Sequence, residues 1–358
     1  MTDSSLLIYG ANGYTGELIA REAKERGLEP ILAGRNRQAV ESLAAELDFP
    51  ARIIGLDDPG ALRETLSGVA AILHAAGPFV QTSRPMVEAC LDTGTHYLDI
   101  TGEIAVFEAI ERLNSRARAA GVVLLPGAGF DVVPTDCLAA KLAAGLRDAT
   151  HLELAFCSDT GSWSRGTLKT MIEGMPYSGA IRRDGRIESV PLAYDAKKID
   201  FSCGSRWAVT IPWGDVSTAF HTTGIPNIRV YVGMPPGTIK RMRALRGTLP
   251  IMGLKPVKRL AQWWVGRTVT GPGEMVRNTA RTYVWGEAKN QGGERVTATL
   301  ETPEAYGLTA TTAVECARRV LAGDVDPGAW TPGRAFGPEL LAALPGVIES
   351  PVESSTDQ

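Results

Sequence analysis

The chain has 358 residues, a length that suits about two domains at roughly 150 residues each. Its 44% hydrophobic and 22% charged residues lie close to the globular average, which excludes wholesale disorder and a coiled-coil rod. With 37 Lys and Arg against 40 Asp and Glu, the net charge of -3 argues against a nucleic-acid partner.

The cysteines and histidines are scattered, without a CxxC pair or another metal-ligand spacing. This excludes the usual zinc patterns, so we expect no metal, and it favours reduced thiols in a cytoplasmic compartment. The first residues carry no positive segment and only a short apolar run, which is unlike a signal peptide. No run approaches the ~20 apolar residues of a membrane span, so a spanning protein is excluded, whereas peripheral membrane association stays open.

The N-terminal part of the sequence alternates short apolar runs with longer segments of helical periodicity. The apolar runs predict buried parallel strands at residues 6–9, 30–33, 52–55, 70–75, 96–100 and 122–125. The segments between and after them predict helices at residues 17–26, 38–47, 59–66, 85–92, 105–119 and 135–145. Six strand–helix units in succession predict an α/β domain of the Rossmann type, with a doubly wound parallel sheet.

Beyond about residue 150 this alternation ends, and Gly, Pro, Thr and Trp become frequent. Residues 279–289 and 294–302, joined through Asn290-Gln291-Gly292-Gly293, predict the two strands of a hairpin. We expect a mainly antiparallel second domain, which we assign to substrate binding or dimerisation. A helix at 308–322 is expected to return to the first domain, and the polar residues 349–358 to form a loose tail. The predicted divisions are 1–148, 149–304 and 305–358.

The strongest motif is Gly10-Ala11-Asn12-Gly13-Tyr14-Thr15-Gly16, which follows the first predicted strand and opens the first helix. Its glycines allow a tight turn, a close approach of the backbone to a pyrophosphate, and close packing of helix on strand. The helix N-terminus adds amide donors. The spacing G-x-x-G-x-x-G departs from the commoner G-x-G-x-x-G, but its strand–loop–helix context predicts dinucleotide binding. The structural alternative is a glycine-rich turn that binds nothing.

The end of the second predicted strand indicates which nucleotide is preferred. NAD-binding sites usually place an Asp or Glu there to hold the ribose hydroxyls, but this strand ends in Gly34-Arg35-Asn36-Arg37. Gly34 leaves room for a 2′-phosphate, Arg35 can bind it and Arg37 can assist, because a planar guanidinium suits phosphate. The pattern therefore predicts NADP(H), and the alternative is a solvated helix start. Asp57 could accept a hydrogen bond from the adenine amino group, or cap the next helix.

Further motifs follow in order: His74-Ala75-Ala76-Gly77-Pro78-Phe79, then HYLDITGE at residues 96–103 and PGAGFDVVP at residues 126–134. Together with the glycine loop and Leu32-Ala33-Gly34-Arg35, they resemble the saccharopine dehydrogenase-like oxidoreductases. The resemblance is closest to the branch that contains the trans-acting enoyl reductases of lipid and polyketide assembly. It covers about the first 140 residues, with weaker similarity at residues 302–308 and 331–337. It implies a Rossmann domain, an inserted antiparallel α+β domain and NADP.

The resemblance also assigns positions around the cofactor. Ala76, Gly77 and Pro78 should lie along its ribose and pyrophosphate, whereas Gly129 and Phe130 should approach the nicotinamide. The physics agrees, because ligands of open α/β sheets collect outside the carboxyl ends of the strands, where these loops lie. The alternative for both loops is ordinary strand-to-helix turn chemistry.

Three polar side chains are candidates for the chemistry: Tyr97 and Asp99 at the end of the fifth predicted strand, and Asp131 after the sixth. For an enoyl thioester, a phenol or backbone amides could stabilise the enolate oxygen, and an acid or water could protonate the α carbon. Tyr97 is the first candidate for the donor. The alternatives are that Tyr97 packs in the core, that Asp99 holds a loop, and that Asp131 caps the helix near Pro134. His96 is interpreted as a satisfied strand-end histidine.

A basic segment, residues 229–267, lies in a stretch without any acidic residue. Its nine Lys and Arg leave a net charge of -12 on the rest of the chain. Apolar residues at helical spacing predict one face of an amphipathic helix, formed by Val257, Leu260, Ala261, Trp264 and Val265. Three interpretations stay open: a helix pair packed on the second domain with a solvated basic face, a surface for an acidic acyl carrier protein or coenzyme A phosphates, and a membrane-surface helix.

The preferred function is an NADP(H)-dependent oxidoreductase that reduces an enoyl, acyl or lipid-like substrate by hydride transfer. The alternatives are a saccharopine-type imine reductase and a noncatalytic NADP(H)-binding scaffold. The former needs a cationic site for several carboxylates, but Arg182, Arg183 and Arg186 look like an exposed hairpin tip around Asp184-Gly185. The sequence is also compatible with a homodimer.

Overall fold

The computed structural model describes residues 5–159, 164, 166–168, 172, 179–248, 254–268 and 271–356. The chain forms two compact units, one of residues 1–131 with 306–335 and one of residues 132–305 with 336–358. The sequence-based division stays a prediction. The compact units differ from it in placing residues 132–148 and the C-terminal residues with the second sheet.

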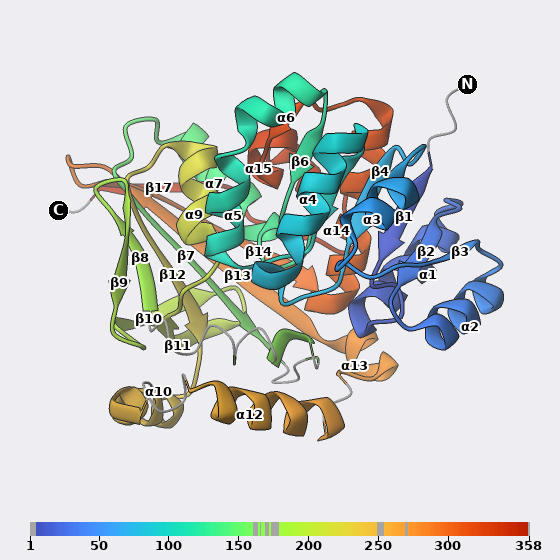
Figure 1. The fold of residues 1–358 in the computed structure, drawn as a ribbon. Coiled ribbons are helices and arrows are strands. Elements are labelled where there is room, and N and C mark those ends of the chain that lie inside the picture. The colour runs from blue at the N-terminus through green and yellow to red at the C-terminus, as the bar shows by residue number, and fades with distance from the viewer. Residues whose placement is uncertain are drawn as a thin grey trace. The chain divides into compact units, whose positions relative to one another are not determined.

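Among the described residues, the first unit forms a parallel sheet of seven strands in the order β15-β6-β5-β4-β1-β2-β3 (Figure 1). Chain order reverses between β1 and β4, so the sheet is doubly wound, as predicted. The predicted apolar runs all become strands, and β1 and β4 are buried along their whole length. The strands are β1 Leu6–Tyr9, β2 Ile31–Gly34, β3 Ala51–Ile53, β4 Ala71–His74, β5 His96–Asp99, β6 Val123–Leu125 and β15 Gly328–Ala329.

Helices cover this sheet, with α3, α4, α5 and α6 packed in one layer (Figure 1). The helices of this unit are α1 Tyr14–Glu25, α2 Arg37–Leu47, α3 Pro59–Leu66, α4 Phe79–Thr93, α5 Ile104–Glu111, α6 Asn114–Ala120, α14 Ala305–Ala322 and α15 Pro332–Phe336. As predicted, the helix after the hairpin belongs to the first unit.

Two predicted helices in this unit have the wrong bounds. Helix α4 begins six residues before Pro85, because the Glu103 carboxylate accepts the N–H groups of Phe79 and Val80 at 2.8 Å each and so stabilises an earlier start. The single helix predicted at 105–119 is two helices, α5 and α6.

The second unit contains a mixed, mostly antiparallel sheet whose main path is β10-β11-β12-β7-β13-β14-β16. Its one parallel pair among the described strands is β7 with β12. The predicted hairpin is confirmed as β13 and β14. The strands are β7 His151–Ser158, β8 Gly179–Arg183, β9 Arg186–Val190, β10 Ala196–Phe201, β11 Gly204–Thr210, β12 Asn227–Gly233, β13 Arg281–Lys289, β14 Glu294–Pro303, β16 Ile348–Glu349 and β17 Glu353–Thr356.

The tail predicted to be loose is instead paired, since β16 and β17 both lie antiparallel to β14. Lys141 Nζ also binds Glu349 Oε2 at 2.7 Å. Polarity misled the prediction, because an edge strand needs backbone partners whatever its side chains are. The helices of this unit are α7 Val133–Gly145, α9 Asp215–Thr223, α10 Pro236–Ala244, α12 Lys255–Thr268, α13 Glu274–Thr279 and α16 Glu339–Ala342, with a 3₁₀ turn η2 at Leu245–Thr248. None of the helices in the described part of the chain has the length and hydropathy to cross a membrane.

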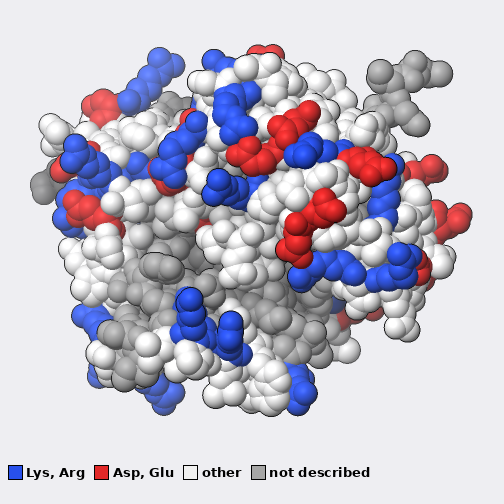
Figure 2. Space-filling view, in the orientation of Figure 1, with Lys and Arg blue, Asp and Glu red and all other residues white. Residues whose placement is uncertain are grey.

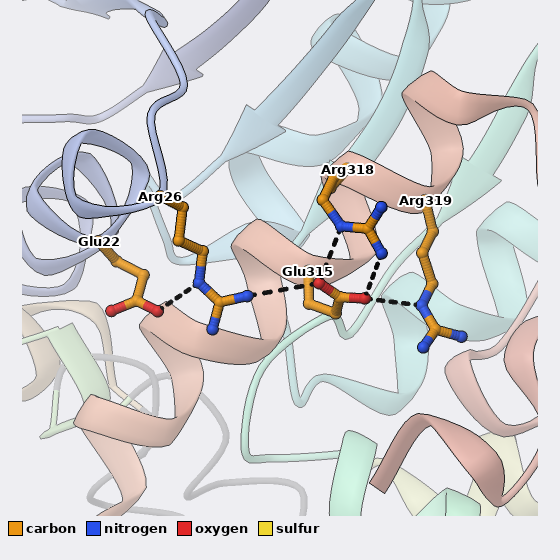
Figure 3. A network of polar contacts seen from close by, with 5 residues as sticks. All are labelled: Glu22, Arg26, Glu315, Arg318 and Arg319. Atoms are coloured by element: carbon orange, nitrogen blue, oxygen red, sulfur yellow. Dashed lines mark hydrogen bonds and ion pairs between the residues drawn. The ribbon is translucent and has the colours of Figure 1, made fainter. Parts of the chain in front are cut away.

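A network around a buried carboxylate joins α1 to α14 in the first unit (Figure 3). Glu315 on α14 accepts hydrogen bonds from Arg318 at 2.8 and 3.1 Å, and from Arg319 at 2.8 Å. Arg26, at the end of α1, lies 3.3 Å from the same carboxylate and 2.7 Å from Glu22. The guanidinium of Arg318, and then that of Arg319, lowers the pKa of Glu315 to about 2. The network therefore anchors the helix that follows the glycine loop.

We expect Glu315→Gln to lower stability at neutral pH by about 2 kcal/mol, because it leaves three guanidinium groups without their shared carboxylate. The pKa of Glu315 is lowered on folding, so its contribution is fully present above about pH 5 and is lost as the pH falls towards about 2. Thermal unfolding of both proteins across this range should show the difference shrink on acidification. Glu88→Gln, which breaks the exposed pair with Arg116, is the control and should cost much less, because solvent screens that pair. A difference that is independent of pH would contradict the assignment.

Candidate nucleotide and active site

The glycine loop, residues 10–16, turns from β1 into α1 at the carboxyl edge of the sheet. Gly10 has a φ of 81°, and a Cβ there would lie 2.8 Å from the Cβ of Ala76 in the loop after β4. A Cβ at Gly16 would collide with the carbonyl group of Gly10. The Gly10 N–H donates to Ala33 O of β2 at 2.8 Å. Glycine is therefore required here for both conformation and close approach.

The N-terminus of α1 is open to an anion. Gly13 precedes the helix, and no side chain of the described residues caps this end by a hydrogen bond. Helix amides and the helix dipole therefore present a partial positive charge. Asn12 is exposed, Tyr14 and Thr15 are half-buried, and the ring of Tyr14 packs edge-on against Tyr306 at 5.2 Å between centroids. These features fit the pyrophosphate of a dinucleotide.

The predicted 2′-phosphate site follows β2. Gly34 is buried beside Asn12, and a Cβ at this glycine would lie 2.9 Å from Asn12 Oδ1. Arg35 is exposed and forms no hydrogen bond or ion pair with any described residue. Arg37, in contrast, pairs with Glu41 at 2.8 Å. Arg35 is therefore the cation available to a phosphate, with Arg37 in a secondary position.

Asp57 is exposed after β3, and it does not cap the next helix. Asp58 caps α3 instead, its Oδ1 accepting two N–H groups of the first turn at 2.9 and 3.0 Å. The charges of Arg35 and Asp57 both act on the hydroxyl of Tyr9. Burial raises the pKa of Tyr9, Arg35 lowers it and Asp57 raises it. The two charged groups therefore both lie within electrostatic reach of Tyr9, at the end of β1.

The loop after β4 is held by local hydrogen bonds. Ala76 and Pro78 are half-buried, and Gly77 is exposed. The Thr82 hydroxyl donates to Ala76 O at 2.7 Å and approaches Pro78 O at 3.2 Å. The Glu103 carboxylate occupies the N-terminus of α4, so an external anion has no free amides there. This role of Glu103 was not predicted from the sequence. Glu103 lies in the loop after β5, whereas the helix whose start it binds, α4, follows β4.

Tyr97 and Asp99 lie fully buried on β5. The Tyr97 hydroxyl donates to Asp99 Oδ2 at 2.7 Å, and Asp99 Oδ1 accepts the N–H groups of Thr101 and Gly127 at 3.0 and 2.9 Å. Burial raises the pKa of Asp99 to about 6, against the opposing effect of these hydrogen bonds. The geometry favours the alternatives in which Tyr97 packs in the core and Asp99 holds the loop after β6. Direct catalytic roles for the two residues stay predictions.

His74 extends this buried polar chain and was not singled out from the sequence. Its Nδ1 lies 3.3 Å from the hydroxyl of Tyr97. Edge-on contacts surround its ring, with centroids 5.4 Å from Tyr9, 5.4 Å from Phe79 and 6.0 Å from Tyr97. Burial lowers the pKa of His74 to about 3, so the imidazole is neutral. His96, as interpreted, is satisfied by a backbone N–H of β6 at 3.0 Å.

Asp131 has a different environment. Its carboxyl is half-buried and forms no hydrogen bond with a described residue. The residue preceding α7 is Val132, and Asp131 does not cap the helix, so that alternative is wrong. A Cβ at Gly102 would lie 2.6 Å from Asp131 Oδ2, which leaves only glycine compatible with the carboxyl. Burial, and then the charge of Glu103, raises the pKa of Asp131 to about 7. Asp131 can therefore carry a proton near neutral pH.

Helix α14 fixes the loop that carries Gly129 and Phe130. The Phe130 N–H donates to Thr309 Oγ1 at 3.0 Å, and the Thr312 hydroxyl donates to Ala128 O at 2.8 Å. A Cβ at Gly129 would lie 2.9 Å from Thr309 Cγ2. The ring of Phe130 is buried, so its assignment to the nicotinamide stays a prediction. The two threonines were not identified from the sequence.

The second unit has a hollow of its own, of about 520 Å³. Cys157, Cys203, Arg206, Trp207 and Met234 are among its lining residues. The Cys157 and Cys203 sulfurs lie 3.8 Å apart. None of the predicted site residues lines this hollow. Within the described ranges, no three His, Cys, Asp or Glu side chains gather as metal ligands.

A doubly wound sheet with an open glycine loop and an unpaired arginine after β2 defines an NADP-binding domain. Residues 6–125 match the family model described as the saccharopine dehydrogenase NADP binding domain. The resemblance seen in the sequence is thereby confirmed for residues 6–125.

Similar proteins are named either trans-acting enoyl reductases or saccharopine dehydrogenase-like oxidoreductases. The trans-acting enoyl reductase of Mycobacterium leprae is 31% identical over 139 residues, which are 37% of this chain and 33% of that protein. The saccharopine dehydrogenase-like oxidoreductase of Mus musculus is 26% identical over 230 residues, covering 57% and 53% of the two chains. The matches thus span between a third and about half of these relatives. The saccharopine dehydrogenase (L-Glu forming) of Saccharomyces cerevisiae has the same fold, with a TM-score of 0.67 over 99% of this chain and 100% of that one, at 13% identity.

We expect Arg35→Ala to weaken NADPH binding by about 1.5 to 3 kcal/mol, the scale of a charged hydrogen bond, and to leave NADH binding almost unchanged. Arg37→Ala is the matched control and should cost less, because Arg37 already pairs with Glu41. Calorimetric titration of both nucleotides measures these effects. Equal affinity of the native protein for NADPH and NADH would overturn the 2′-phosphate assignment.

We expect Asp131→Asn to stabilise the protein above neutral pH by about 2 kcal/mol, because the native fold disfavours the charged carboxylate. The pKa of Asp131 is raised from 3.8 to about 7 on folding, so the native stability falls as the pH rises through this interval. The advantage of the variant should therefore grow between about pH 4 and pH 7 and level off above. Melting temperatures across this range provide the measurement. A variant that is less stable than the native protein at alkaline pH would show that Asp131 is paired.

Proposed function

We propose that this protein is an NADP(H)-dependent reductase of enoyl thioesters or similar lipid-like acyl substrates. The observation that carries the proposal is Asp131, a carboxyl group without a hydrogen-bond partner among the described residues, at the carboxyl edge of an NADP-binding sheet. NADPH, when bound, supplies the hydride. The chain must then hold the acceptor and deliver a proton.

Asp131 is proposed as the proton donor to the α carbon. A donor works best when its pKa lies near the working pH, and burial together with Glu103 brings the pKa of Asp131 to about 7. Glu103 is held away from the reaction by its bonds to the start of α4, so its charge acts on Asp131 without competing for the proton. Tyr97 and Asp99 are proposed as positioning residues, because Tyr97 binds Asp99 and Asp99 holds the loops after β5 and β6.

One observation favours an acyl substrate over the imine of a saccharopine-type enzyme. Arg182 is only 5% exposed, so the prediction of an exposed tip is wrong for this residue. Its guanidinium donates to the carbonyl groups of Val216 and Gly185 at 2.8 Å each. Arg183 pairs with Glu188 at 2.7 Å. Two of the three arginines considered for binding substrate carboxylates are therefore engaged within the protein.

The names of several relatives support the same choice. The matched proteins of Mycobacterium leprae and Mycobacterium ulcerans are named trans-acting enoyl reductases, the latter being 29% identical over 184 residues. A noncatalytic scaffold, the remaining alternative, has no need of a carboxyl with a raised pKa beside the cofactor site. Such a group is unfavourable for stability, which is typical of residues retained for function.

We expect the protein to oxidise NADPH when it is given α,β-unsaturated acyl thioesters, with little response to an amino acid mixed with an aldehyde. Asp131→Asn should lower kcat by about 10²-fold to 10⁴-fold while NADPH affinity stays unchanged, since the residue is placed at the substrate and not at the phosphates. In the native protein kcat should fall as the pH rises above about 7, where Asp131 loses its proton. The absorbance of the reduced nicotinamide reports turnover. Nucleotide binding without turnover of any thioester would favour the scaffold.

A further inference from the structure

Helix α12 turns an apolar stripe towards solvent. Val257, Leu260 and Trp264 follow one another at three- and four-residue spacing and are 37%, 67% and 59% exposed. Trp263 lies beside them and is 53% exposed. Val265, at the edge of the same apolar face, is only 5% exposed. The predicted packing of the apolar face is therefore only partly correct: Val265 is buried, whereas Val257, Leu260 and Trp264 are exposed.

Positive charges border this stripe. Lys255 and Arg259 are exposed and form no ion pair with any described residue. The guanidinium of Arg267 lies 4.4 Å from the ring centroid of Trp263. Helix α10 contributes the exposed Lys240 and Arg241. Figure 2 shows Lys and Arg side chains over α10 and α12, in the lower part of the view. We name the exposed residues of α10 and α12 the basic platform.

The basic platform is anchored and is not a free peptide. Ile239 of α10 is 4% exposed. Arg243 Nε donates to Ala193 O at 3.1 Å, and Arg246 donates to Leu192 O at 2.7 Å and to Ala193 O at 2.9 Å. These arginines are used to attach the segment to the second unit. The exposed Lys240, Arg241, Lys255 and Arg259 are left, together with the apolar stripe, for an external surface.

We propose that the basic platform binds the surface of an anionic phospholipid bilayer. Indole and aliphatic side chains suit the boundary between headgroups and acyl chains, and flanking cations suit the lipid phosphates. An acidic carrier protein would satisfy the cations, whereas an anionic bilayer satisfies both the cations and the row of exposed Leu and Trp side chains. Charge also favours this orientation, because the net charge of -12 outside the basic segment is repelled by the membrane. The proposal stands on α12 and does not depend on the reductase activity.

Sedimentation with phosphatidylcholine vesicles, with and without phosphatidylglycerol, tests the proposal on the full chain. The native protein should bind the anionic vesicles more tightly, and high salt should weaken this binding. Each cation removed near an anionic surface should weaken binding about fivefold, so Lys255→Glu with Arg259→Glu should weaken it at least about 25-fold. The matched control is Arg112→Glu with Arg147→Glu, which changes the net charge equally at exposed arginines elsewhere. The control should retain most of the binding.

The apolar part is tested separately. Trp264→Ala should weaken vesicle binding about tenfold or more, and Trp207→Ala, at a tryptophan that is 40% exposed on β11, should have little effect. All variants should keep native circular dichroism and NADPH affinity. Absence of binding to anionic vesicles at low salt would overturn the proposal, as would equal losses in the basic-platform and control variants. Binding of a small acidic acyl carrier protein in place of vesicles would show that the platform serves a protein.

Discussion

The close approach of two loops at the carboxyl edge of the first sheet is the constraint on which the site depends. Gly10 and Ala76 lie so near each other that even a methyl group on Gly10 would clash. Gly16 keeps α1 against the same turn. This closeness aims the uncapped start of α1 at the space where a pyrophosphate would bind, while Glu315 fixes the other end of the helix to α14. The helix is thus held at both ends, so the binding of an anion need not order it first.

Three carboxyl groups near the ends of β5 and β6 show how environment divides chemical roles. Asp99 is saturated by a phenol and two backbone amides, and Glu103 is saturated by the start of α4. Asp131 is shielded from solvent and lies near the negative charge of Glu103, and it receives no hydrogen bond from a described residue. Its neutral form is therefore favoured. Of the two structural carboxylates, Glu103 raises the pKa of the third carboxyl group, Asp131, which we propose as the proton donor. Separation of pKa values by environment is a recurrent basis of acid–base catalysis.

The sequence predicted the sheet well because buried parallel strands are apolar on both faces, a pattern that needs no knowledge of neighbours. It failed where distant residues decide the outcome. Helix α4 starts at Phe79 because of Glu103, 24 residues away, and the loop at Phe130 is held by Thr309, 179 residues away. The C-terminal tail looked loose because its backbone partners on β14 leave no mark in its own side chains. The position of the glycine loop between β1 and α1 could be predicted from local spacing, whereas the difference between Tyr97 and Asp131 depends on burial and partners.

An unpaired cation indicates a binding site only when a second feature of that site lies beside it. Exposed ion pairs contribute little to stability, so the lack of a partner at Arg35, Lys255 or Arg259 is not by itself unfavourable. Elsewhere the chain pairs its arginines readily, as Arg26, Arg318 and Arg319 do around Glu315. Arg35 stands next to the glycine loop that we propose to bind phosphate, and Lys255 and Arg259 border the apolar stripe that we propose to contact lipid. In both places a positive charge lies beside a second feature that suits the same ligand. We therefore propose these three residues as ligand-binding cations, in contrast to cations that only keep the surface solvated.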